Sequence, residues 1–245
     1  MKKKAYPFHR VCGEYISNEV RDFLKREALW PPDEVAEIRQ FMLSSTDGKQ
    51  ATLPLDLGGF GISRYTLDLF LYQRAQQEGV EVLEKEQVLD VHKKNRRMQV
   101  TLQRGGMREV DMVLGAFGKR SRLDKTLQRS FMQQEGAYIG VKYHVKSDFD
   151  PHTVALHNFP GGYCGMNKVE GDRYNLCYLG SQKDLKTYGS IPEMEAARLH
   201  QNPLLKEIFT SSTFLFEKPE VITSVSFAKK APIEQDILML GDAAG

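Results

Sequence analysis

The segment from residue 58 to residue 84, GGFGISRYTLDLFLYQRAQQEGVEVLE, places the strongest limit on how this chain can fold. Ser63 or Thr66 can cap the start of a helix, and Gly79 is placed to end it. The apolar residues between them recur at helical spacing: Leu67, Phe70, Leu71 and Ala75. The sequence VEVLE follows at once and predicts a strand over 80–84. A helix that leads through glycine into a strand is half of a βαβ unit, which indicates an α/β region.

The regions around this segment predict further strands and helices. Ser17 is placed to cap a short helix over 17–29, and Arg104-Gly105-Gly106 is typical of a hairpin turn. From about Gly136 the sequence alternates and is rich in aromatic residues, as antiparallel strands are. We expect strands at 35–43, 50–55, 87–92, 98–103, 109–115, 213–217 and 221–227, and helices at 192–200 and 203–210.

Composition excludes several classes of protein. The 245 residues carry 34 basic and 32 acidic side chains, a net charge of +2, so we expect no nucleic-acid partner. No stretch approaches ~20 uninterrupted apolar residues, so we expect no membrane span. The odd cysteine count and the absence of metal-ligand spacing predict free thiols, no metal site and a cytoplasmic location.

The last nine residues, ILMLGDAAG, predict a buried strand that runs into a tight turn. Small residues at such a turn let the backbone approach a ligand closely, and Asp242 can accept hydrogen bonds from sugar-like hydroxyls. The segment VLGAFGKRSRLD (113–124) is a second strand that ends in a glycine turn, where Gly115 and Gly118 bracket the bend. An ordinary strand-to-helix turn explains this second segment equally well.

Arg64 is placed at the start of the predicted helix over 63–78. A cation at this position opposes the helix dipole, at a cost of about 0.3–1 kcal/mol, so its placement points to a function. The alternative is a surface arginine whose stem covers apolar neighbours. Tyr163 and the other aromatic residues of the strands beyond Gly136 have two interpretations as well, sheet core or substrate pocket.

Together, in this order and spacing, the motifs at 61–68, 115–118 and 241–242 resemble the geranylgeranyl reductases and the p-hydroxybenzoate hydroxylase-like aromatic hydroxylases. These flavoproteins share the glutathione-reductase-like FAD fold with an inserted antiparallel sheet. The segment RVCGEYIS (10–17) is similar to the reductase branch. The resemblance therefore implies an α+β fold made of an α/β FAD-binding part and an antiparallel substrate sheet.

The same resemblance implies positions for the cofactor. Asp242 would bind the ribityl chain, and Gly241 would allow the close approach that this contact needs. Further cofactor residues implied in the same way are Arg64 beside the flavin or its phosphates, the backbone of Val88 facing the adenine, Gly115 and Gly118 at the turn, and Cys12 and Gly13 near the isoalloxazine. No acid–base pair is assigned a catalytic role.

The sequence departs from the family pattern at several points. Phe117 stands where the family's GADG turn has an acid, and Tyr163 alone survives from the substrate-loop pattern Tyr-x-Trp-x-Phe-Pro. The halogenases' Trp-x-Trp-x-Ile-Pro motif cannot be present, because Trp30 is the only tryptophan. The chain contains no GxGxxG, so the pyrophosphate-binding segment of the fold is missing and we expect a fragment of a longer reading frame or a remnant.

The resulting hypothesis has two domains. Residues 1–135 and 229–245 are expected to form a partial FAD-binding domain, and residues 136–228 a substrate-binding antiparallel sheet. The expected function is an FAD-dependent reductase that passes hydride from reduced flavin to a C=C bond of an apolar or aromatic small molecule. NAD(P)H or another carrier would supply the electrons. The alternatives are an FAD-dependent monooxygenase and a non-catalytic remnant or binding module that no longer holds FAD.

Overall fold

The computed structural model describes residues 4–32, 34–133 and 136–245, and the chain divides into two compact units. One, here named the sheet unit, combines residues 7–78 with 137–223. The other, here named the turn unit, consists of the described parts of 1–6, 79–136 and 224–245. The division into cofactor and substrate domains that we expect from the sequence stays a prediction.

A nine-stranded mixed sheet forms the sheet unit, with the strand order β1-β3-β2-β9-β10-β11-β8-β12 and with β13 paired to β8. From β1 to β12 the neighbouring strands of this order are antiparallel, except that β2 is parallel to β9, where Met42 lies opposite Ala155 and Ser44 opposite His157. The strands are β1 (Tyr15–Ser17), β2 (Ala36–Ser44), β3 (Gln50–Gly61), β8 (Tyr138–Lys146), β9 (Thr153–Phe159), β10 (Gly162–Lys168), β11 (Tyr174–Ser181), β12 (Thr213–Phe214) and β13 (Glu220–Val225).

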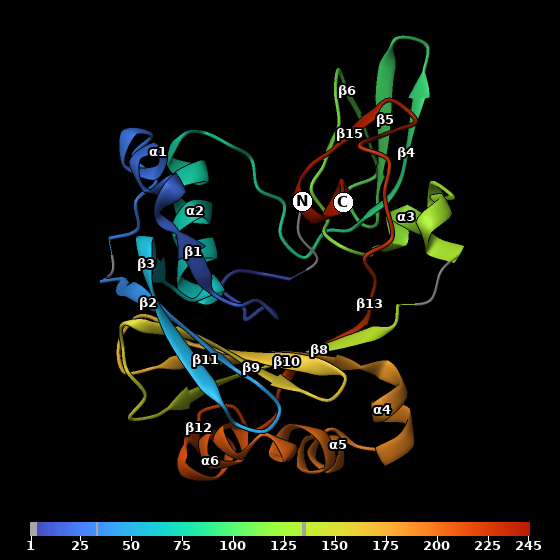
Figure 1. Cartoon of the computed structure of the whole chain (residues 1–245). Helices are drawn as coiled ribbons and strands as arrows, with labels where there is room; N and C mark the ends of the chain where they lie inside the picture. Colours follow the sequence, from blue (N-terminus) through green and yellow to red (C-terminus); the bar gives the residue numbers. More distant parts are fainter. Residues whose placement is uncertain (1–3, 33, 134–135) are drawn as a thin grey trace. The chain divides into compact units, whose positions relative to one another are not determined.

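The two faces of this sheet differ because successive side chains of a strand point to opposite sides. The helix face carries alternate apolar residues of β8 to β11, which form one buried core with helices α5 and α6. Figure 1 shows α4, α5 and α6 grouped on this side of the strands. The helices are α4 (Gln182–Tyr188), α5 (Ile191–Arg198) and α6 (Pro203–Ser211), and the shared core includes Ile139, Val141, Met166, Leu176, Met194 and Leu205.

Two helices accompany the first strands of the sheet unit. Helix α1 (Arg21–Arg26) follows a short 3-10 turn (Asn18–Val20), where the Ser17 hydroxyl accepts a hydrogen bond from the backbone N–H of Glu19. Helix α2 (Arg64–Gln77) begins after Ser63, whose side chain accepts a hydrogen bond from the backbone of Thr66. Gly79, with a φ of +79°, follows the end of α2, so the limits of this helix confirm the sequence prediction.

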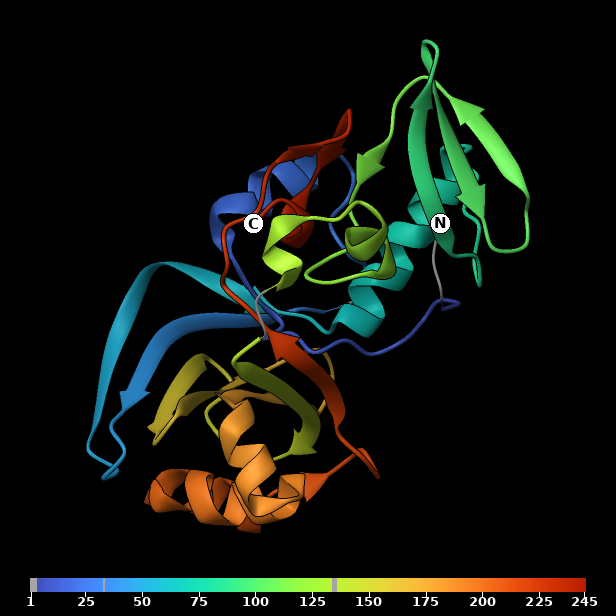
Figure 2. The same cartoon turned by 90° about the vertical axis from the view of Figure 1, so that its right-hand side faces the viewer.

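The turn unit contains two small sheets and a short helix. Strands β4 (Val88–Lys94), β5 (Arg97–Leu102) and β6 (Met107–Val110) form an antiparallel meander, drawn in green in Figure 2. The second sheet has the order β14-β15-β7, with β7 (Leu114–Gly115), β14 (Ile233–Glu234) and β15 (Ile237–Met239). Their apolar side chains share one core with α3 (Arg122–Thr126), centred on Val91, Leu123 and Ile237.

Some predicted elements differ from the structure. The strand predicted over 80–84 is wrong, since only an isolated bridge at Glu84 occurs there. Strand β3 continues to Gly61, six residues beyond the predicted end, because its second half pairs with β1 and with the start of β2. Helix α4 was not predicted, because its short and charged sequence QKDLKTY has no apolar periodicity.

The described residues also give findings on the cysteines, on membrane spans and on metal sites. Cys12, Cys164 and Cys177 are all free thiols. None of the helices within residues 4–32, 34–133 and 136–245 has the length and hydropathy needed to span a bilayer. The same residues contain no group of three or more His, Cys, Asp or Glu side chains arranged to hold a metal ion.

Candidate functional site

The predicted cofactor residues divide between the two units. Val88, Gly115, Gly118, Gly241 and Asp242 lie in the turn unit, whereas Cys12, Gly13 and Arg64 lie in the sheet unit. Each group is described by itself.

The structure brings the two predicted glycine turns of the turn unit together. Strands β7 and β15 are parallel, with Met239 opposite Gly115, and the backbone N–H of Leu240 donates to the carbonyl of Gly115 at 2.9 Å. Both strands therefore end at the same edge of the sheet, and their turns leave it side by side. In open α/β sheets, ligands bind outside the carboxyl ends of the strands. We call this pair of turns, residues 115–119 and 240–243, the turn edge.

Two glycines of the turn edge leave its backbone open, and a third allows its strands to pack closely. Gly118 has a φ of +86° and Gly241 a φ of +56°, and a Cβ at either would meet no heavy atom within 4 Å. The positive φ explains why glycine stands there, and the open space leaves the backbone accessible to a ligand. A Cβ on Gly115 would lie 2.6 Å from Sδ of Met239, so Gly115 is needed for strand packing.

Asp242 and Phe117 have opposite environments at the turn edge. Asp242 is exposed in a 3-10 turn, and among the described residues its carboxylate has no hydrogen-bond or ion-pair partner. Phe117, which replaces the acid of the family pattern, packs against the core of the turn unit instead. The chain therefore keeps one free carboxylate at this edge, on the second turn.

A buried ion pair that the sequence did not reveal holds the second turn in place. The side chain of Arg129 is 1% exposed, and its Nη1 donates to Asp124 and to the carbonyl of Ala243, at 2.9 Å each. Its Nη2 donates to the carbonyl of Ala231 at 2.7 Å. Asp124 also completes the capping box of α3 with Ser121. No local pattern predicts these contacts, because they join residues up to 114 positions apart.

Val88 begins β4, which is the edge strand of the β4-β5-β6 sheet. Its side chain packs against the core of the turn unit, and a register irregularity separates it from Asp90. The predicted contact of its backbone with adenine stays a prediction.

In the sheet unit, the structure brings Arg64 and Cys12 together. Burial by itself would lower the pKa of the Arg64 guanidinium, but the Asp68 carboxylate and the Cys12 sulfur outweigh burial and raise that pKa. Nε and Nη2 of Arg64 donate to Asp68 at 2.8 and 3.0 Å, and Nε of Arg10 pairs with the same carboxylate at 2.8 Å. This pairing of residues i and i+4 explains how α2 accommodates a cation in its first turn.

Two carboxylates occupy the backbone donors at the start of α2. Glu14 accepts from the N–H of Arg64 at 2.7 Å, and Glu170 accepts from the N–H of Ser63 at 2.7 Å and from its hydroxyl at 2.6 Å. Negative groups are favourable at this end of a helix. An anionic ligand would therefore meet the side chain of Arg64 here, because these N–H groups are already engaged.

Glu14 is the centre of a buried ion cluster on the face of the sheet opposite α4, α5 and α6, which we call the loop face. It accepts hydrogen bonds from Nζ of Lys142 and, at 2.7 Å, from Nε2 of His144. The Glu14 and Lys142 side chains are 0% exposed and that of His144 is 2% exposed. This cluster was not predicted, since Glu14 lies 128 and 130 residues from its partners in the sequence.

The ion cluster fixes the Cys12-Gly13 segment on the sheet. Asn175 donates to the carbonyl of Gly13 at 2.8 Å, and the backbone N–H of Glu14 donates to Sγ of Cys12 at 3.5 Å. Glu14 itself has a φ of +53°, a conformation that a non-glycine residue adopts only when its surroundings hold it there. A Cβ on Gly13 would meet no heavy atom within 4 Å, so the outer side of this turn is open.

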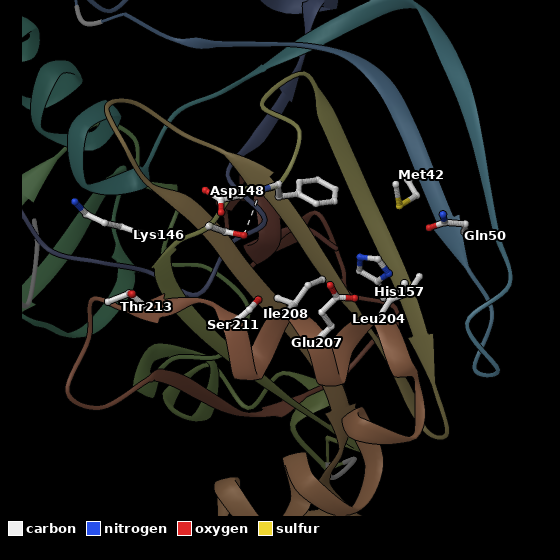
Figure 3. Close-up of a pocket in the computed structure, with 12 residues that line it drawn as sticks. Met42, Gln50, Lys146, Asp148, His157, Leu204, Glu207, Ile208, Ser211 and Thr213 are labelled. Carbon is white, nitrogen blue, oxygen red and sulfur yellow. Dashed lines mark hydrogen bonds between the residues drawn. The ribbon is translucent and has the colours of Figure 1, made fainter.

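A cavity of about 550 Å³ lies on the helix face of the sheet unit, next to α6 (Figure 3). None of the predicted cofactor residues lines it. Its lining includes Met42, Lys146, Phe149, His157, Leu204 and Ile208.

The residues present fit part of an FAD molecule. The turn edge offers open backbone and a free carboxylate, which suit the hydroxyls of a ribityl chain. The 245 residues contain no GxGxxG, so the usual cradle for the pyrophosphate is not among them.

Comparison of the structure with solved proteins identifies the fold. The flavin-dependent halogenase CmlS matches 99% of this chain at a TM-score of 0.72 and 18% identity. A geranylgeranyl bacteriochlorophyll reductase-like protein of Thermoplasma acidophilum matches 99% at a TM-score of 0.76 and 16% identity. The halogenase PltM, solved in complex with phloroglucinol and FAD, matches 99% at a TM-score of 0.74 and 14% identity.

The matched region is only part of each solved structure: the chain spans 48% of the CmlS chain, 63% of the reductase-like chain and 58% of the PltM chain. The sequence matches no protein-family model and no curated protein. The resemblance predicted from the sequence is confirmed at the level of the fold. The chain has the fold shared by the flavin-dependent halogenases and the geranylgeranyl reductase-like flavoproteins.

Proposed function

We propose that this chain is an FAD-dependent oxidoreductase of the reductase type, which passes a hydride from reduced flavin to a C=C bond of its substrate. The turn edge is the observation that carries the proposal. Gly118 and Gly241 keep their positive φ beside open space, and Asp242 offers a free carboxylate at the ends of two parallel strands. FAD would supply the electron-transfer chemistry, and the protein would supply position and electrostatics.

Arg64, Cys12 and Gly13 support the reductase form of the proposal. The ion cluster around Glu14 holds the Cys12-Gly13 turn with its outer side open. Arg64 is hydrogen-bonded to Asp68 and lies beside Cys12, so its positive charge is placed next to this turn. NAD(P)H or a small electron carrier would reduce the flavin, and a cytoplasmic location remains part of the proposal.

The loop face supports an apolar or aromatic substrate. Leu43 pairs with Leu156 across β2 and β9, Leu156 with Gly165, and Gly165 with Cys177, so these residues form one row on this face. Leu43 in that row is 42% exposed, and Leu53 and Tyr163 beside the row are 58% and 43% exposed. Exposed apolar side chains that gather on one surface favour the binding of apolar molecules.

An FAD-dependent monooxygenase is the second candidate, because such an enzyme would use the same fold and the same turn edge. Turnover separates the two: oxygen consumption coupled to substrate would contradict the reductase. A halogenase is not proposed although halogenases share the fold, since Trp30 is the only tryptophan and the Trp-x-Trp-x-Ile-Pro motif cannot be present. The third candidate is a remnant that binds no flavin.

Titration with FAD tests the proposal. The purified chain should acquire the visible absorption of bound flavin and quench flavin fluorescence on addition of FAD. Asp242→Ala should weaken FAD binding about tenfold, because a carboxylate that would accept hydrogen bonds from ribityl hydroxyls is lost. Asp111→Ala is the matched control, since the Asp111 side chain is 88% exposed and forms an exposed surface ion pair with Arg97. A protein that stays colourless after soaking with FAD would contradict the enzyme and favour the remnant.

A further inference from the structure

Lys230 links the two turns of the turn edge. Its Nζ donates to the carbonyl of Lys119, on the first turn, at 2.8 Å, and to the carbonyl of Asp242, on the second. The same Nζ lies 4.8 Å from the centre of the Phe131 ring. An ammonium group has three N–H donors, so one donor remains after the two carbonyls are satisfied.

The charge of Lys230 is not neutralised by a salt bridge. Within the part of the chain that the structure describes, no carboxylate oxygen is recorded within 4.0 Å of its Nζ. Asp124, the buried acid of this region, is already bonded to Arg129 and to Ser121. The Lys119 and Arg129 cations add to the positive charge, and Asp242 offsets part of it from its exposed position.

Burial, like the neighbouring cations, disfavours the charged form of Lys230. Partial burial lowers the pKa of its ammonium, the nearby Arg129 and Lys119 lower it further, and Asp124 and Asp242 raise it. A cation held in such a place is stabilised by any anion that binds against it. Lysine commonly binds phosphate groups as a point charge.

We propose that Lys230 and the turn edge form an anion subsite that takes a phosphate of the dinucleotide cofactor. This inference rests on the proposed function, because it assigns one group of FAD to one residue. The subsite recognises charge through the remaining N–H donor, while the two carbonyls fix the ammonium between the turns. It would give this chain a phosphate contact although its 245 residues contain no GxGxxG.

Flavins with and without phosphate separate this role from a purely structural one. FAD and riboflavin are titrated into the wild-type chain and into Lys230→Met, Lys230→Arg and Lys229→Met, at low and high salt. Lys229 is the matched control, since it is the exposed neighbour and carries the same charge. Circular dichroism checks that each variant is folded.

Lys230→Met should weaken FAD binding about tenfold or more, reduce its salt dependence and leave riboflavin binding unchanged. Lys230→Arg should retain most of the salt dependence, and Lys229→Met should match the wild type. Equal losses for FAD and riboflavin would overturn the inference, because they would mean that Lys230 only shapes the turns. Unchanged FAD binding in Lys230→Met would overturn this inference but not the proposed function. A wild-type chain that binds neither flavin would overturn both.

Discussion

The helix face and the loop face of the nine-stranded sheet bury their polar groups in different ways. On the helix face, the buried acid Glu195 accepts hydrogen bonds from the hydroxyls of Tyr143 and Tyr178, at 2.9 Å each. Burial raises the pKa of Glu195, although the two hydroxyls oppose that shift. On the loop face, the buried acid Glu14 is bonded to Lys142 and His144, and apolar side chains nearby are exposed.

This difference indicates which face serves stability and which serves binding. A continuous apolar core with α5 and α6 fills the helix face, and burial of that kind is the dominant favourable contribution to folding. The loop face buries charges whose desolvation opposes their attraction, so the cluster contributes little net stability. What it does contribute is a fixed position for the Cys12-Gly13 turn, whose outer side is open.

The largest expected effect comes from breaking the ion cluster. Glu14→Ala leaves Lys142 buried without a counter-charge and should lower the free energy of unfolding by about 3–5 kcal/mol. Urea unfolding measures this change, and Glu19→Ala, at an exposed acid near by, is the control. A loss below about 1 kcal/mol would show that water reaches Lys142, and the contrast between the two faces would then be wrong.

A cavity in the helix face should have the next largest effect. Leu176 is 0% exposed within the core of that face, so Leu176→Ala should lower the free energy of unfolding by about 2–5 kcal/mol. The same urea experiment measures it. If the loss were as small as that of an exposed leucine, the helix face would not be the stabilising side of the sheet.

The pH dependence of stability distinguishes the two faces through their histidines. His157, on the helix face, is 1% exposed, and burial lowers its pKa from 6.5 to about 4. The unfolded chain therefore takes up a proton below about pH 6.5 that the folded chain takes up only near pH 4. Stability is complete above the unfolded pKa and falls as the pH drops through this window, by about 3 kcal/mol for the full shift.

His157→Asn should remove this share of the acid sensitivity, because asparagine can still accept the hydrogen bond from Ser44 and does not titrate. Urea midpoints of the two proteins between pH 7 and pH 4 measure the difference. His9, beside the ion cluster, also has a pKa lowered to about 4, by burial first and then by its neighbours His144 and Lys142. Because His9 is only half-buried, we expect a weaker dependence of the free energy of unfolding on pH to persist in His157→Asn. Parallel pH profiles would contradict the assignment to His157.

Local patterns predicted the parts of the fold that local contacts define. Helix α2 was predicted because Ser63, its apolar spacing and Gly79 all lie within one segment. The strand at 80–84 was wrong because β propensity does not provide a pairing partner. Helix α4 was missed because its residues are charged and its capping by Ser181 is common to many turns.

The candidate site was predictable only in part, for the same reason. Gly241-Asp242 and Gly115 were found because each follows an apolar strand, and the parallel pairing then brings them together. Glu14, Arg129 and Lys230 were missed because their partners are distant in the sequence and no spacing rule connects them. Arg64 was singled out for an unfavourable helix position, yet Asp68 one turn later accounts for that position.

The smallest expected effect on stability belongs to the exposed apolar residues of the loop face. Leu53 is 58% exposed opposite Phe41, so Leu53→Ser should change the free energy of unfolding by no more than about 0.5 kcal/mol. If the loop face binds the substrate, the same variant should weaken binding of an apolar fluorescent probe to the folded chain. Val221→Ser, at another exposed apolar residue on β13, is the control. Equal probe binding by wild type and Leu53→Ser would show that Leu53, although exposed on the loop face, takes no part in substrate recognition.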